Sequence, residues 1–381
     1  MAHGHYKAYE LIKMKFIIEG KAAATALTKL QRVAGKDINN IVLVAGENQT
    51  LALHAYGLQR RSMICVPASV QQLGKITIER ERFAGICKGR GKLEFIISGN
   101  TLAFQQTGTG YAGKNISLVP YKEVELLKLA TEQAIPEHIQ ARLLQAVRAC
   151  LITSVFGGQQ LGMTLLVSRD YFRVVTTDSY HSAIAEFIIT EGERKRLRRI
   201  GLREPVILPM EYAEILARQF TMGGLTISAN NKRITFANKE MKLELPALQS
   251  NTAMLQHALR LNQQFNHRSI TITAADNLRG ILDNIKVIGK TDLPLIFGLR
   301  EGDKALNISY NAPAGRITDQ MKLSSASHRN KKLRLEPRNL YDIASKLGKG
   351  DVDLAYNSRI IRITKQLDDL RVDYYSSQLQ H

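Results

Sequence analysis

The sequence predicts an α+β fold of three tandem modules with antiparallel sheets. One observation is a repeat: the stretch from Lys15 to Tyr56 returns without a gap, 254 positions later, between Ser269 and Tyr310. A second is that each copy reads as an extended piece, a helical piece ending at Gly-Lys, and two further extended pieces joined by a short polar turn. Because short turns join the strands and no long crossover is needed, the sheets are expected to be antiparallel.

The spacing of the two copies leaves room for one copy between them. The letters LQAV at Leu144 match LQRV at Leu30, which indicates a weaker middle copy. Three modules of about 120 residues each are near the usual domain size. We therefore predict a leader or tag-like segment at residues 1–13, followed by modules at 14–122, 123–248 and 249–381.

The helices follow from apolar residues spaced three and four apart, and the strands from short apolar runs between turn residues. In chain order the expected helices are Lys21 to Ala34, Glu79 to Lys88, Pro136 to about Leu151, EYAEILARQF, Asp276 to Ile288 and Arg338 to Leu347. The run EVELLKLA from Glu123 is expected to be the first strand of the middle module, and the basic stretch after AIAEFII is expected to be a loop.

Three glycines, Gly108, Gly110 and Gly113, have the spacing G-x-G-x-x-G of a dinucleotide-binding loop. That motif must follow a strand and open a helix. Here extended segments lie on both sides, so we expect a hairpin turn and no cofactor.

Positive charge is the main compositional feature of the chain. Lys and Arg number 53 against 34 Asp and Glu, a formal net charge of +19, which is typical of proteins that bind polyanions, nucleic acid above all. No apolar run is long enough to cross a membrane, and a cytoplasmic protein is expected. The cysteines Cys65, Cys87 and Cys150 have no metal-ligand spacing, and we expect no metal site.

The cations recur at similar places in the modules, which indicates backbone contacts to double-stranded DNA. A single charge run is usually only a solvated surface, but solvation gives no reason to follow a repeat. The candidate DNA-binding residues are Lys29, Arg32, Lys36, Arg80, Arg82, Arg142, Arg148, Arg196, Arg198, Arg199, Arg279, Lys286, Lys290, Lys331, Lys332 and Arg338.

The sequence contains no recognisable catalytic constellation, so no enzymatic activity is expected. It lacks a phosphate-binding P-loop, a G-x-S-x-G elbow and an H-E-x-x-H motif. The pairs Asp351 with Asp353 and Asp368 with Asp369 are the only hint of a magnesium-dependent nuclease, and solvent-facing carboxylates explain them better.

Several segments together resemble the bacterial DNA sliding clamp family, the DNA polymerase III beta subunit, as a divergent phage-type or plasmid-type member. They are MKFIIEG, LQRVAGK, FAGICKG before KLEFIISGNTLAF, and VVTTDSYHSA before VILPMEYAEIL. The resemblance implies three DNA-clamp (processivity-fold) domains per chain, sheets outside and helices lining a central hole. It also implies a homodimeric ring that encircles duplex DNA and tethers a DNA polymerase, with a clamp loader as a further partner.

In that family, the segment that resembles VVTTDSYHSA helps to form a pocket for short partner peptides. The resemblance places this pocket at Gln160, Thr177, Ser179, Tyr180, His181, Ser182 and Pro246. The family usually has glycine, histidine, arginine and leucine where this chain has Ser179 to Ser182. The peptide specificity is therefore expected to differ.

Two alternatives remain beside the ring. The first is a clamp-like protein that acts as an open monomer and holds duplex DNA by charge alone, which the net charge favours. The second, from another class, is a nuclease that uses the Asp pairs.

Overall fold

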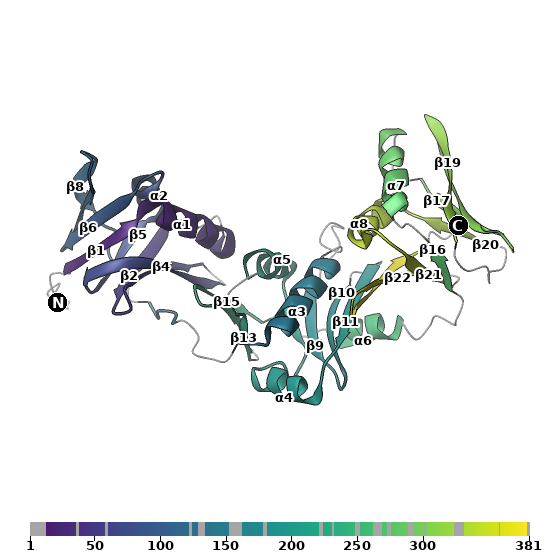
Figure 1. Ribbon diagram of the computed structural model, residues 1–381, viewed down its shortest axis with the longest axis horizontal. Coiled ribbons are helices and arrows are strands. Elements are labelled where there is room, and N and C mark those ends of the chain that lie inside the picture. Colours follow the sequence, from purple (N-terminus) through teal and green to yellow (C-terminus); the bar gives the residue numbers. More distant parts are fainter. Residues whose placement is uncertain are drawn as a thin grey trace, which may run out of the picture. The chain divides into compact units, whose positions relative to one another are not determined.

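The fold was analysed in a computed structural model of the chain (Figure 1). The structure describes residues 13–35, 38–57, 60–121, 124–128, 134–151, 162–177, 181–220, 224–230, 232–247, 252–261, 269–272, 276–288, 293–300, 302–323, 331–357 and 359–378.

One structural motif, a strand, a helix and three strands, recurs along the chain. It occurs twice in the N-terminal region, and each occurrence is called a half-module below. The first comprises β1 (Lys13–Glu19), α1 (Gly20–Ala34), β2 (Asn40–Gly46), β3 (Thr50–Tyr56) and β4 (Arg61–Gln72). The second comprises β5 (Gly74–Glu79), α2 (Arg80–Cys87), β6 (Lys92–Ser98), β7 (Thr101–Gln106) and β8 (Ala112–Ser117).

In the described residues, the middle of the chain repeats this order without a first strand before α3 and with one additional helix. The third half-module comprises α3 (Glu137–Cys150), β9 (Met163–Val167), β10 (Tyr171–Thr177) and β11 (His181–Ile188). An additional helix, α4 (Glu191–Arg199), then precedes the fourth half-module. That half-module comprises β12 (Val206–Leu208), α5 (Met210–Gln219), β13 (Thr226–Ala229), β14 (Arg233–Ala237) and β15 (Met241–Pro246).

The C-terminal region begins with helix α6 (Thr252–Leu261) and then repeats the motif twice. The fifth half-module comprises β16 (Ser269–Ile272), α7 (Asp276–Ile288), β17 (Leu295–Leu299), β18 (Ala305–Ala312) and β19 (Gly315–Lys322). The sixth comprises β20 (Lys331–Leu335), α8 (Pro337–Leu347), β21 (Val352–Tyr356), β22 (Ile360–Leu367) and β23 (Leu370–Ser377).

Where a half-module has a described first strand, this strand pairs with a strand of the neighbouring half-module. β1 pairs with β6 and β5 pairs with β2, so the first two half-modules exchange first strands. In the same way β16 pairs with β21 and β20 with β17, and β12 pairs with β9. Every strand pair in the described part of the chain is antiparallel, which confirms the predicted mixed α and β architecture with antiparallel sheets.

Further pairs join the last strands of half-modules. β4 pairs with β15, and β11 pairs with β23. The resulting sheets run β13-β14-β15-β4-β1-β6-β7-β8, with β3, β2 and β5 branching from β4, and β12-β9-β10-β11-β23-β22-β21-β16. A separate sheet has the order β19-β18-β17-β20.

The N-terminal helices cover the sheets through an aromatic and aliphatic core. Phe16 and Phe95 stack with ring centroids 5.0 Å apart, and Phe83 of α2 lies 5.6 Å from Phe95. All three rings are fully buried. On α1 the buried residues recur at the spacing of a helix face, which explains why this segment is a helix packed on a sheet.

The two N-terminal helices α1 and α2 lie side by side (Figure 1). Hydrogen bonds also link the start of each helix to the segment that follows the other. The first backbone N–H of α1, at Gly20, donates to the carbonyl of Gly91 just after α2, at 2.9 Å. Reciprocally, the first N–H of α2, at Arg80, donates to the carbonyl of Asn39 just after α1, at 2.8 Å. These bonds satisfy donors that the helices cannot satisfy themselves.

Chain contacts divide the molecule into two compact units. One comprises residues 1–137 and 219–246, and the other comprises 138–218 and 247–381. This division cuts through the predicted middle module, because β15 extends the sheet of the first unit and β11 that of the second. The three-module boundaries at 122 and 248 remain a prediction.

Two local predictions were wrong and one was confirmed. Residues 124–128 of EVELLKLA form no strand, because side chains anchor them: Arg61 pairs with the Glu125 carboxylate at 2.8 Å and Tyr56 Oη donates to its carbonyl at 3.4 Å. The basic stretch expected to be a loop contains α4. Gly108 lies in the turn between β7 and β8 with φ of 76°, so the glycine-rich segment is a hairpin turn.

None of the helices in the described residues is long and apolar enough to cross a membrane.

Replacement of Gly20 by Ala is expected to destabilise the fold. A Cβ at this position would lie 2.8 Å from the carbonyl oxygen of Cys87, a backbone atom that cannot move without separating α1 from α2. We expect a loss of about 1–3 kcal/mol in the free energy of unfolding, measured in urea. The matched control is Gly85→Ala on α2, where a Cβ meets no atom within 4 Å and a gain of about 0.5–1 kcal/mol is expected. Equal effects of the two changes would contradict the close approach at Gly20.

The protein is expected to lose stability when the pH is lowered, because His54 is buried in its neutral form. This residue of β3 is buried, and burial lowers the pKa of its imidazole from 6.5 to about 4. Between about pH 6.5 and pH 4 the imidazole is therefore protonated in the unfolded chain but remains neutral in the folded chain. The free energy of unfolding should be largest above pH 6.5 and should drop by about 3 kcal/mol as the pH falls to 4. In urea titrations across this range, a His54→Gln variant should lack this part of the slope.

Candidate nucleic-acid interface

The outer face of α1 carries cations and no acid. Lys21, Thr25, Thr28, Lys29 and Arg32 follow one another at the spacing of a single helix face, opposite the buried stripe. All five are exposed, and the two threonine hydroxyls bond back to carbonyls of the same helix. Among the residues that the structure describes, no carboxylate forms an ion pair with Lys29 or Arg32. Their charges are therefore available to an external anion.

On α2 the predicted cations already have anionic partners. Arg80 pairs with Glu81 at 3.1 Å, and Arg82 pairs with Glu79 at 3.1 Å. Arg82 also donates to the carbonyl of Ser117 at 2.9 Å. An incoming phosphate would have to compete with these carboxylates, so α2 offers less free positive charge than α1.

The two arginines of α3 also bond to neighbouring elements. Arg142 forms an ion pair with Asp369 in the turn after β22, and its guanidinium lies over the ring of Phe187, 5.8 Å from the centroid. Arg148 is exposed and donates to the carbonyl of Ala217 at the end of α5, at 3.0 Å. Arg142 is therefore mainly engaged in contacts within the protein. Arg148 bonds to α5, and its charge is still exposed to solvent.

Helix α4 projects a basic surface that the repeat does not explain. Its start is a capping box, in which Thr190 accepts from the N–H of Glu193 and the Glu193 carboxylate accepts from the N–H of Thr190. Burial would raise the pKa of the Glu193 carboxyl, but hydrogen bonds from His138 and Thr190 hold it below its usual range. Leu197 is the buried residue of α4.

The predicted cations of α4 differ in exposure. Arg198 and Arg199 are exposed at its end, whereas Arg196 is half-buried. Figure 1 shows α4 well separated from α5, so these arginines do not continue the surface of that helix.

The C-terminal helices α7 and α8 pack against each other, and a lysine of α7 contacts a tyrosine ring of α8. The ammonium of Lys286 lies 3.0 Å from the centroid of the Tyr341 ring on α8, a cation–π contact. Arg279 is 3.9 Å from Asp283 on the same helix, and Arg338 is exposed at the start of α8. The predicted residues Lys36 and Lys290 lie outside the described residues.

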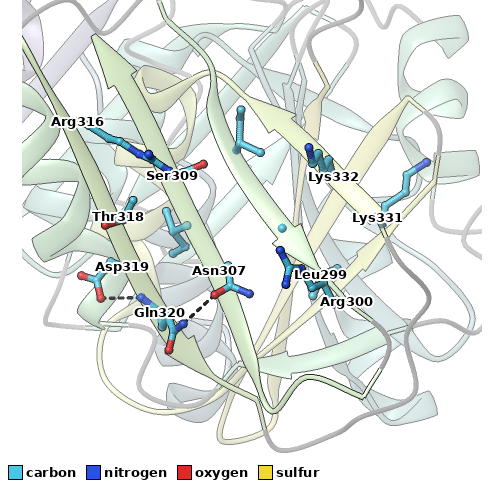
Figure 2. A pocket seen from close by; sticks show the side chains of 13 residues that line it. Leu299, Arg300, Asn307, Ser309, Arg316, Thr318, Asp319, Gln320, Lys331 and Lys332 are labelled. Carbon is cyan, nitrogen blue, oxygen red and sulfur yellow. Dashed lines mark hydrogen bonds between the residues drawn. The ribbon is translucent and has the colours of Figure 1, made fainter.

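Lys331 and Lys332 belong to a different surface. They lie on β20, whose buried residues Leu333 and Leu335 alternate with exposed or half-exposed ones. Both lysines line a hollow of about 1060 Å³ over the sheet β19-β18-β17-β20 (Figure 2). The structure thus places these two cations on a sheet surface and not with the helix cations.

Of the four predicted peptide-pocket residues that the structure describes, His181 and Ser182 are buried polar groups, and Thr177 and Pro246 are half-buried. Thr177 ends β10, and its hydroxyl lies 2.7 Å from that of Ser182 and donates to the carbonyl of His181 at 3.3 Å. His181 and Ser182 begin β11 and are buried. Pro246 ends β15 in the first compact unit. Gln160, Ser179 and Tyr180 lie outside the described residues.

Sequence reasoning missed an apolar cluster beside this segment. Val175 of β10, Ile184 of β11 and Tyr375 of β23 pack with Leu255, Ala258 and Leu261 of α6. The apolar spacing of Leu255, Ala258 and Leu261 was the available signal for this helix. Helix α6 therefore covers these strands next to Thr177 and Ser182.

The carboxylate pairs considered for a nuclease do not form a metal site in the described part of the chain. No group of three His, Cys, Asp or Glu side chains is placed to hold an ion there. Asp369 is engaged by Arg142, and Asp368 lies in the β22–β23 turn with φ of 53°.

Comparison with solved structures identifies the architecture. The DNA polymerase III subunit beta of Pseudomonas aeruginosa superposes with a TM-score of 0.78 at 16% identity, covering 97% of this chain and 100% of that one. The Caulobacter crescentus DNA polymerase sliding clamp superposes with a TM-score of 0.77 at 15% identity, covering 97% and 100%.

The beta subunit from the DNA polymerase of Streptococcus pyogenes superposes with a TM-score of 0.77 at 12% identity, covering 96% and 100%. This chain has the fold of a DNA sliding clamp. No family model and no curated protein matches the sequence. The sliding-clamp fold is thus preserved here at identities of 12–16%.

Proposed function

We propose that the chain is a non-enzymatic DNA sliding clamp, a homodimeric ring that encircles duplex DNA and tethers a DNA polymerase in the cytoplasm. The sliding-clamp fold over almost the whole chain supports this proposal. Each chain would contribute three modules, at residues 14–122, 123–248 and 249–381. The ring of two chains would then contain six modules. The proposal includes a clamp loader as a further partner.

The observation that carries the proposal of a ring is the pairing of last strands. Six half-modules end in β4, β8, β11, β15, β19 and β23. Four of these are used within the chain, in the pairs β4 with β15 and β11 with β23. β8 and β19 remain as the terminal strands of their sheets. Two chains that pair β8 with β19 twice would continue the same rule and close.

The cations of the helices supply the second support. Lys29 and Arg32 on α1 have no ion-pair partner among described residues, and phosphate contacts of this kind carry no sequence information. They therefore permit sliding along any duplex, while closure of the ring supplies retention. Among the described residues of the predicted lumen helices, those of α1 include the most cations without a carboxylate or aromatic partner.

Retention on circular DNA tests closure of the ring. At raised salt, the protein should stay on nicked circular DNA and run off linear DNA of the same length, because only a topological link resists screening. The mass in solution should be twice the chain mass of 42.6 kDa, measured by light scattering. Equal loss from circles and linear DNA, with the mass of one chain, would show the open monomer that holds DNA by charge alone.

Removal of the α1 charges should weaken duplex binding. Lys29→Ala with Arg32→Ala is expected to lower the slope of log affinity against log salt by about 1.8, because each phosphate that a cation neutralises on a duplex adds about 0.9 to that slope. The control is Lys232→Ala with Lys239→Ala, which removes two exposed charges from β-turns. The slopes come from fluorescence anisotropy of a labelled duplex. If both double variants weaken binding equally, the assignment to α1 is wrong and only net charge matters.

A further inference from the structure

The hollow over the sheet β19-β18-β17-β20 lies on the face that the helices do not cover. Phe297, Leu306 and Ile308 point to the buried side, where α7 packs on the sheet. Their neighbours Asn307 and Ser309 alternate to the other side and line the hollow (Figure 2). The hollow is therefore separate from the helix surface that the proposed function uses.

Positive charge lies on both sides of this hollow. Arg316 comes from the edge strand β19, whereas Arg300, Lys331 and Lys332 come from the end of β17 and from β20. Figure 2 shows Arg316 on one side and Lys332 with Arg300 on the other. Because β18 and β17 lie between the outer strands, the two sides are about 14 Å apart, three strand spacings.

Among the described residues that line the hollow, the one acid, Asp319, already accepts a hydrogen bond. The Asp319 carboxylate accepts the backbone N–H of Gln320 at 2.7 Å. An anion in the hollow therefore meets four cations and one carboxylate whose charge is partly satisfied. This imbalance favours an anionic ligand over a neutral or cationic one.

The floor of the hollow has polar side chains beside the apolar Ile296, and its centre is open. Gln320 donates its side-chain amide to Asn307 at 2.8 Å, and Asn307 donates to Asp303 at 3.2 Å, so the amides are held in fixed positions. Gly298 lies between them and β20, and a Cβ there would only reach ordinary contact with Asn307, at 3.6 Å and beyond. The absence of a side chain leaves the centre of the floor free.

The size and the lining indicate the class of ligand. A volume of about 1060 Å³ exceeds what one phosphate or a small metabolite fills. Ser309 and Thr318 offer hydroxyls, and none of the described residues that line the hollow is aromatic, so these residues give bases no ring to stack on. Contacts to successive phosphates remain, and arginine and lysine are the residues that make them.

We propose that this face of the C-terminal four-stranded sheet is a second nucleic-acid site, which binds the phosphodiester backbone of a strand outside the helix-lined surface. Arg316 contacts the backbone from one side, and Lys332 with Arg300 contacts it from the other. Lys331, which precedes the buried Leu333 by two residues on β20, adds its charge at the rim of the hollow. The polar floor accepts sugar or phosphate oxygens without reading the sequence.

The test is the double variant Lys331→Ala with Lys332→Ala in the full-length protein. The probe is a labelled oligonucleotide of about 12 nucleotides, a length that single-strand binders occupy. Affinity should fall more than tenfold at low salt, and the log–log salt slope should fall by about 1.4, since each neutralised phosphate of a single strand adds about 0.7. A labelled duplex of the same length, with the slope falling by about 1.8, shows which form the site prefers.

The control is again Lys232→Ala with Lys239→Ala, which removes an equal number of lysine charges from the first compact unit. Both pairs are also measured in a chain that carries Lys29→Ala and Arg32→Ala, so that the α1 surface does not contribute. A fall in affinity that is specific to Lys331 and Lys332 in both backgrounds supports the site whether or not the chain forms a ring. Equal falls for the two lysine pairs would overturn it.

A second variant tests the shape without changing the charge. Gly298→Ile adds a β-branched side chain that suits a strand and fills the centre of the floor. Oligonucleotide binding should weaken several-fold while circular dichroism and the urea midpoint stay near those of the wild type. Unchanged binding by a folded Gly298→Ile protein, or binding of polyglutamate but not of either oligonucleotide through Lys331 and Lys332, would refute a phosphodiester site.

Discussion

The structure depends on backbone pairing at the edges of its sheets. A half-module cannot complete a sheet alone, because its first strand lies in the sheet of its neighbour: β1 beside β6, and β5 beside β2. The helices follow from this exchange. Once the strands are crossed over, α1 and α2 are brought together, and the start of each helix finds its hydrogen-bond partners just beyond the end of the other.

Charge placement separates the cations into groups with different roles. Lys29 and Arg32 are exposed on a helix face without ion-pair partners among the described residues, whereas Arg80, Arg82 and Arg142 already meet carboxylates. A net charge of +19 therefore overstates the free positive charge near the helices. Part of it lies on α4, and part lies on the sheet β19-β18-β17-β20 at Lys331 and Lys332.

The sequence was sufficient for those elements whose local pattern agrees with their tertiary setting. The helix predicted from Asp276 to Ile288 has these bounds in the structure, because its apolar spacing and its packing against α8 point to the same face. The basic stretch was misread because its charge resembles a loop. The signal that was available is Thr190 three residues before Glu193, which forms the capping box.

Other parts could not be predicted from local pattern. Whether Lys332 lies with the helix cations or on a sheet depends on which side of β20 it occupies, and this follows from strand pairing, not from the charge run. The peptide-pocket residues were chosen by resemblance, and among the described ones Thr177, His181 and Ser182 contact one another at the β10–β11 end. The domain boundaries and the roles of the site residues stay predictions.

The joint between β11 and β12 has a consequence for how this architecture can vary. The corresponding connection between β4 and β5 is a single residue, Leu73. Between β11 and β12 the chain contains α4, yet β11 still pairs with β23 and β12 still pairs with β9. When the strands on both sides of a connection are each paired with another strand, the connection can become longer, form a helix and change its charge while the sheets stay intact. Such joints are where chains of this fold could acquire new surfaces during evolution, and where a foreign segment could be grafted.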